Sequence, residues 1–161
     1  MTDSYNRMGV YDFVLWEPMN PTAVSSETRE LAERLVTVEA AAENQSTNDA
    51  HARCRVCEKL RRPLITLTGT AGYSSLLLRA LTLAKREALA LNEVQVKPDG
   101  SLEGLDGEAV LAHPILVAYL LSLLITFIGE ALTMRLLHDI WPDLPNSDLT
   151  SSGRNRNEST Q

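Results

Sequence analysis

The sequence predicts an all-α fold, a small bundle of about four helices with a short β-hairpin inserted around residues 94–104. Hydrophobic residues make up 44% of the chain but aromatic residues only 5%, so the apolar content is mainly Leu, Ala, Val and Ile, which suits helix packing. Apolar residues recur at helical spacing in several segments. A length of 161 residues fits one compact domain.

Three regions are expected along the chain. Residues 1–24 contain interrupting glycine and proline residues and form an irregular N-terminal arm, which we expect to dock through Phe13 and Trp16. Residues 25–142 form the helical bundle domain. Residues 143–161 are rich in Ser, Asn, Thr and Arg, so we expect a disordered polar tail.

The first helix is predicted over residues 26–43, with Ser25 or Ser26 as its N-cap. Its apolar stripe consists of Leu31, Leu35, Val38 and Ala42. A second helix is predicted over residues 48–62, because Asp49 lies near its start and basic residues crowd its end. Pro63 is expected to end or kink this helix.

Residues 64–68 fit either a short strand or a helical turn, and a third helix is predicted over residues 71–91. Its apolar stripe consists of Leu77, Leu81, Ala84, Ala88 and Leu91, and the opposite stripe of Ser75, Arg79, Thr82 and Arg86. The following Pro98-Asp99-Gly100 sequence favours a tight turn in which the glycine has a positive φ. We therefore expect a β-hairpin here.

The last helix is predicted over residues 114–140, with Pro114 in its first turn. No residue from Ala109 through Gly129 is charged, a run of 21, so a membrane span over residues 114–137 is the alternative. The apolar pattern, however, continues past Glu130, and the flanks lack a Lys/Arg cluster. Because the stripes of the other helices need a partner, we expect this helix to be the buried centre of the bundle.

His51, Cys54 and Cys57 form the pattern H-x-x-C-x-x-C, whose imidazole and thiolates are zinc ligands. His113 or His138 would have to supply a fourth ligand. The two cysteines also fit the apolar stripe of their helix, where cysteine behaves as a small hydrophobic residue. We interpret them as core residues and expect no metal site.

The segment Leu67–Ser75 resembles the T-G-x-x-G-x-x-G phosphate turn of short-chain dehydrogenases and sugar-nucleotide epimerases. That resemblance implies nucleotide binding. Ser75 stands where the third glycine would be, and no acidic residue follows on a later strand to bind a ribose. We therefore interpret the segment as a loop and a helix start, and expect no cofactor.

Two further acid–base candidates lie in the last helix. Glu130 is the only carboxylate within the most apolar stretch, and we expect it to be partly exposed or paired with Arg79 rather than a buried acid. His138 and Asp139 are adjacent in sequence, and a histidine near a helix C-terminus is explained by the helix dipole. We expect no catalytic residue in this helix.

A net charge of −6 argues against general affinity for nucleic acids or anionic lipids. Two cysteines do not make a disulfide framework, and the N-terminal residues lack the pattern of a secretory signal, so a cytoplasmic location is expected. The chain has no Walker A loop, serine nucleophile motif or HExxH motif.

These patterns favour a non-enzymatic interaction or regulatory module that binds a protein partner. A first alternative is a single-span membrane protein whose helical domain faces the cytoplasm. A second alternative is a metal- or nucleotide-dependent enzyme.

Overall fold

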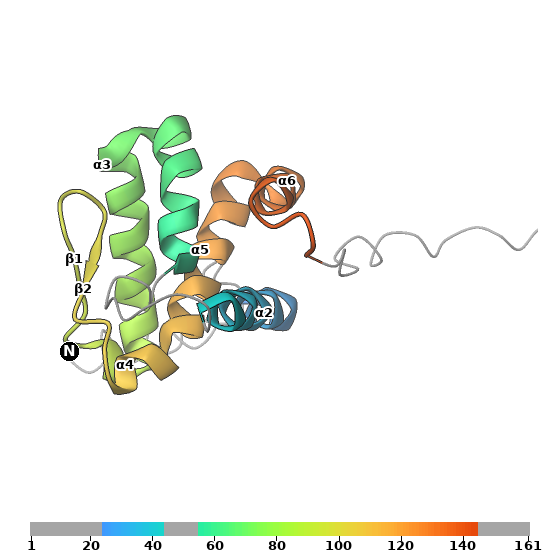
Figure 1. The fold of residues 1–161 in the computed structure, drawn as a ribbon. Coiled ribbons are helices and arrows are strands. Elements are labelled where there is room, and N and C mark those ends of the chain that lie inside the picture. Colours follow the sequence, from blue (N-terminus) through green and yellow to red (C-terminus); the bar gives the residue numbers. More distant parts are fainter. Residues whose placement is uncertain (1–23, 44–54, 145–161) are drawn as a thin grey trace, which may run out of the picture.

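The computed structural model describes residues 24–43 and 55–144. Its helices are α2 (Ser26–Glu43), α3 (Arg55–Glu87), α4 (Glu108–Leu111), α5 (His113–Ile128) and α6 (Glu130–Ile140). A short 3₁₀ turn, η3 (Leu89–Leu91), and the strands β1 (Gln95–Val96) and β2 (Leu102–Glu103) connect α3 to α4 (Figure 1). The predicted all-α bundle with a hairpin insert is confirmed.

Helix α3 folds back on itself at Gly69, whose φ of 77° and ψ of 167° are not helical. Figure 1 shows the resulting arms, residues 55–68 and 70–87, running side by side. The Tyr73 hydroxyl of the second arm donates a 3.0 Å hydrogen bond to the backbone oxygen of Cys57 in the first. The turn between the arms depends on a glycine because these dihedral angles strongly disfavour a residue with a side chain.

Of the two outcomes expected at Pro63, an end or a kink, the helix does not end there, since α3 continues through it and residues 64–68 are helical. Proline inside a helix costs about 3 kcal/mol, because it lacks the N–H that would bond to an earlier carbonyl. Leu60 and Leu64, on either side, are fully buried. Burial of each leucine side chain stabilises the folded state by about 1.5–3 kcal/mol, which offsets the cost of the proline.

Helix α5 is the centre of the bundle, and it packs against both α3 and α2 (Figure 1). Its buried residues are His113, Leu116, Val117, Ala118, Leu120, Leu121, Leu123 and Leu124. Pro114 lies in its first turn, as predicted. Within residues 24–43 and 55–144, no helix combines the length and apolar character needed to cross a membrane.

The prediction of one continuous helix over residues 114–140 is wrong. The chain breaks at Gly129, whose φ of 86° and ψ of 159° lie in a region that is essentially restricted to glycine. Helix α6 then begins at Glu130 and packs back against α5. The sequence alone does not show that the helix turns at this glycine. A glycine inside a helix lowers stability by only about 1 kcal/mol relative to alanine, so the helix could also have continued through it.

The hairpin forms as predicted. Its strands are antiparallel, with Val96 opposite Leu102, and Gly100 at the turn has a φ of 81°. The Asp99 carboxylate accepts a 3.0 Å hydrogen bond from the backbone N–H of Ser101, which closes the turn. The hairpin is held against both arms of α3, because its turn carbonyls accept hydrogen bonds from Arg61 and Ser74.

Helix α2 begins as its sequence predicts, since the Ser25 hydroxyl accepts a 3.2 Å hydrogen bond from the backbone N–H of Thr28. Only the first half of its predicted apolar stripe is buried. Leu31 and Leu35 enter the core, whereas Val38 is 47% exposed and Ala42 is exposed. Toward the end of the helix the buried position is Glu39, one residue after the predicted Val38, so a carboxylate lies inside the protein.

Candidate functional site

An apolar groove of about 920 Å³ lies beside the second arm of α3. Both arms of α3 and the C-terminal end of α5 supply its walls. The lining residues are Leu64, Leu67, Thr68, Gly72, Ser75, Leu76, Leu78, Arg79, Thr82, Leu83, Arg86, Leu124, Phe127 and Ile128. We refer to this surface as the α3–α5 groove.

The large apolar side chains of the α3–α5 groove are unusually exposed. Leu67 is 56% exposed, Leu78 54% and Phe127 64%, and they come from three different helical segments. Other exposed large apolar residues, such as Leu89 and Leu111, lie outside the groove. A gathering of exposed apolar side chains in one hollow is typical of a binding surface, whereas isolated ones are ordinary.

The charged residues in the groove lining are both arginines, Arg79 and Arg86. They are exposed, and neither belongs to an ion pair within the described part of the chain. Seven residues apart on one helix, they lie on the same face with a rise of about 10 Å between them. The groove thus combines an apolar floor with two guanidinium groups that are available to carboxylates.

The two glycine breaks explain why the groove exists. Gly69 ends the first arm of α3, and Gly129 ends α5, so the last residues of both helices remain at one end of the bundle. Leu67 and Thr68 come just before the first break, and Phe127 and Ile128 just before the second. The chain reverses direction at each glycine, and Leu67 and Phe127 stay more than half exposed.

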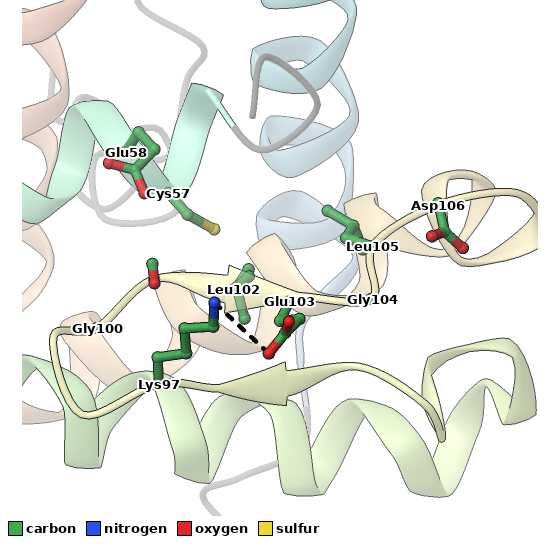
Figure 2. Close-up of a pocket in the computed structure, with 10 residues that line it drawn as sticks. Cys57, Glu58, Lys97, Gly100, Leu102, Glu103, Gly104, Leu105 and Asp106 are labelled. Carbon is green, nitrogen blue, oxygen red and sulfur yellow. Dashed lines mark ion pairs between the residues drawn. The ribbon is translucent and has the colours of Figure 1, made fainter. Parts of the chain in front are cut away.

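A second hollow of about 190 Å³ lies between the hairpin and the first arm of α3. Figure 2 shows the sulfur of Cys57 pointing from α3 toward strand β2. Lys97, just after β1, and Glu103 of β2 form an ion pair of 3.6 Å at its edge. Both of these side chains are about half exposed, so their pair contributes little to stability.

Cys57 is 2% exposed, and its sulfur lies 3.8 Å from Nε2 of His113 in α5. The structure thus brings together two of the residues that the sequence suggested as zinc ligands. His51 and Cys54, the other two residues of the H-x-x-C-x-x-C pattern, lie outside the described residues. Among the described residues, no three His, Cys, Asp or Glu side chains are grouped to hold a metal ion.

The nucleotide-type segment Leu67–Ser75 is helical on both sides of Gly69. A phosphate turn of that kind follows a strand, whereas the residues before Gly69 are helical. The expected loop before the helix start is instead a break at this one glycine within α3. Glu130 is exposed at the start of α6, and no ion pair links it to Arg79 within residues 24–43 and 55–144. Arg79 instead lines the groove.

His138 and Asp139 lie in the last turn of α6. His138 is partly buried and Asp139 is exposed, and no hydrogen bond joins them in the described part of the chain. Their position agrees with the helix-dipole interpretation, because a basic side chain is favoured at this end of a helix.

A buried carboxylate, Glu39, was missed by the sequence reasoning. Its side chain is 6% exposed, and its Oε1 accepts 2.5 Å hydrogen bonds from Lys59 Nζ and from Trp141 Nε1. Lys59 also lies 5.6 Å from the centroid of the Trp141 ring. Oε2 has no hydrogen-bond partner among the described residues. This cluster joins α2, α3 and the segment after α6.

Comparisons with protein-family models, with curated proteins and with solved structures find no match for this chain.

Proposed function

We propose that this protein is a non-enzymatic interaction module that binds an acidic, amphipathic helix of a partner protein in the α3–α5 groove. The observation that carries the proposal is the presence, in one hollow, of three exposed apolar side chains and two arginines that have no ion-pair partner among the described residues. Helix-in-groove recognition uses such a surface, because a partner helix inserts apolar residues at positions i, i+3 or i+4, and i+7.

We expect the affinity for the partner helix to come mainly from burial of the exposed apolar side chains of the groove. Leu67, Leu78 and Phe127 are more than half exposed, so a partner can still cover much of each side chain. Burial of apolar surface contributes about 25 cal/mol per Å², and buried aromatic side chains are common energetic centres of interfaces. Phe127 is therefore the side chain whose loss we expect to weaken binding most.

The arginines supply the preference for acidic partners. Arg79 and Arg86 lie about two helical turns apart. Two glutamates seven residues apart on a partner helix have the same rise, so each can meet one guanidinium. The α3 face that lines the groove extends from Gly72 to Arg86, a rise of about 21 Å, which corresponds to a partner helix of about 14 residues.

A pair of synthetic peptides tests this proposal. The first is a fluorescein-labelled helical 16-mer with leucines at helical spacing and glutamates seven residues apart; the second carries lysine in place of each glutamate. Fluorescence anisotropy with the full chain should show tighter binding of the glutamate peptide. Phe127→Glu or Leu78→Glu should weaken that binding about tenfold or more, because each places a charge in an apolar hollow.

Leu111→Glu is the matched control, since Leu111 is 82% exposed and lies outside the groove. Replacement of Arg79 and Arg86 together by glutamate should reverse the preference toward the lysine peptide. Equal affinity for both peptides, or equal effects of Phe127→Glu and Leu111→Glu, would contradict the proposal.

We also propose that the protein acts in the cytoplasm. Its two cysteines are too few for a disulfide framework, and the described one, Cys57, is a buried free thiol.

A further inference from the structure

We infer that residues 10–17 of this same chain occupy the α3–α5 groove when no partner is bound. This inference rests on the proposed function of the groove, and it makes the N-terminal segment an internal competitor of the partner. The segment reads Val-Tyr-Asp-Phe-Val-Leu-Trp-Glu and lies outside the described residues.

The composition of the segment matches the groove. Six of its residues are apolar or aromatic, and the other two, Asp12 and Glu17, are acidic and can pair with Arg79 and Arg86. The other parts of the chain outside the described residues are poor candidates. Residues 44–54 contain no large aliphatic or aromatic residue, and residues 145–161 contain only Leu149.

The connection to α2 lets the segment reach the groove. Arg29, in the first turn of α2, is hydrogen-bonded to Glu87, the neighbour in sequence of the groove residue Arg86. The start of α2 therefore lies near one end of the groove. Residues 18–23 link the segment to α2 and can extend over about 20 Å, and eight extended residues span about 26 Å. The groove face of α3 rises over about 21 Å, so the segment is long enough to follow it.

Attachment to the same chain makes even weak docking effective. A short linker gives an effective concentration in the millimolar range. If the isolated segment binds with a dissociation constant of about 0.1 mM, an effective concentration of about 1 mM leaves the groove roughly nine-tenths occupied. A partner peptide then binds about tenfold more weakly than it would to an open groove.

Photochemical cross-linking of the full chain tests occupancy directly. Phe127→p-benzoylphenylalanine places a photoreactive aromatic side chain on the groove wall. We expect a cross-link within one chain, at the mass of the monomer, that mass spectrometry maps to residues 10–17. Leu111→p-benzoylphenylalanine is the control and should not cross-link to this segment. A product at the mass of a dimer would identify a second copy as the occupant, and either that result or the absence of a cross-link to residues 10–17 would overturn the inference.

Competition tests the consequence of occupancy. The double variant Phe13→Ser with Trp16→Ser should bind the glutamate peptide about tenfold more tightly than the unmodified chain, because the internal competitor is weakened. Tyr5→Ser, outside the segment, should leave the dissociation constant unchanged. If the peptide binds both proteins equally, the inference is wrong and the proposed function stands. If the peptide binds neither, the proposed function fails, and the cross-link alone decides whether the segment occupies the groove.

Discussion

Gly100, at the turn of the β1–β2 hairpin, combines a positive φ with a close neighbour. Its φ is 81°, and a Cβ atom there would lie 2.7 Å from Cδ1 of Tyr73. Tyr73 is 1% exposed and bonded through its hydroxyl to the first arm of α3, so its ring has little room to move. Gly100→Ala should therefore lower the free energy of unfolding by about 2 kcal/mol, measured by chemical denaturation.

Gly107→Ala separates the two causes of this effect. Gly107 also has a positive φ, of 51°, but a Cβ atom there would meet nothing within 4 Å. Its ψ of −124° lies outside the left-handed helical region, so its substitution should cost backbone strain alone, about 1–3 kcal/mol. A loss for Gly100→Ala of no more than about 1 kcal/mol, the backbone strain alone, would show that the contact between the hairpin and Tyr73 contributes nothing to the cost.

Glu39 shows why sequence pattern fails for some single residues. Helical periodicity favoured Val38 for the buried face, and the structure buries Glu39 instead. The reason lies far away in the chain, because Lys59 and Trp141 supply the hydrogen bonds that make a buried carboxylate tolerable. Neither partner is visible from the local pattern, so this cluster could not be predicted from the sequence.

At the scale of helices, Glu87 joins three of them. The two terminal nitrogens of the Arg29 guanidinium, on α2, donate to its carboxylate at 2.5 and 2.9 Å. The Tyr119 hydroxyl of α5 donates to it at 2.9 Å. The hydrogen bond from Arg29 holds the pKa of Glu87 below its ordinary value of 4.5, although partial burial opposes this shift. The folded state therefore favours the charged carboxylate.

This shift predicts how stability changes with pH. Because the pKa of Glu87 is lower in the folded than in the unfolded chain, its contribution is full above the ordinary value of 4.5 and is lost as pH falls through the folded value. Glu87→Gln should lower the free energy of unfolding at pH 7 by about 1 kcal/mol, the upper end for a partly exposed pair. The difference from the unmodified protein should shrink in denaturation curves recorded below pH 4.5.

Glu30→Gln is the control for this measurement, because Glu30 forms an exposed ion pair with Arg34, and both residues lie in α2. Such an exposed pair contributes only a few tenths of a kcal/mol. A constant difference between the Glu87→Gln and unmodified proteins from pH 7 to pH 3 would show that the junction does not stabilise the charged carboxylate.

The helices themselves were largely predictable, and their breaks were not. Local apolar spacing predicted α2, the second arm of α3 and α5, and the Pro-Asp-Gly turn predicted the hairpin. The sequence predicted an end or a kink at Pro63, whereas the chain turns back at Gly69 and Gly129. Both glycines adopt similar dihedral angles, and whether a glycine turns a helix or continues it depends on the packing that follows.

The α3–α5 groove was predictable only in part. The exposed stripe containing Arg79 and Arg86 follows from the periodicity of the third helix. Phe127 lies on the opposite wall of the groove and is about 40 residues after Arg86 in sequence. This wall exists because α5 ends at Gly129. The sequence predicted one continuous helix over residues 114–140 at the buried centre of the bundle, so Phe127 was expected to be buried.

At the scale of the whole molecule, stability depends on α5. Leu120 and Leu124 lie in its middle and are 0% and 2% exposed, and α5 packs against both α3 and α2. Each Leu→Ala change at these positions should cost about 2–5 kcal/mol, through lost burial and the cavity that remains. Domains of this size are stabilised by about 5–15 kcal/mol in total, so the double variant should melt without cooperativity in circular dichroism.

Two comparisons decide whether α5 is the common centre. Leu111→Ala, at an 82% exposed position, should change the free energy of unfolding by less than about 0.5 kcal/mol.

A fragment of residues 1–105 should not fold, because α2 and α3 contact each other far less than each contacts α5. Without α5, the buried leucines of both helices would face water. Cooperative melting of that fragment in plain buffer would mean that α2, α3 and the hairpin form a self-sufficient unit. The double alanine variant would then be expected to retain that unit's transition and lose only the packing of α5.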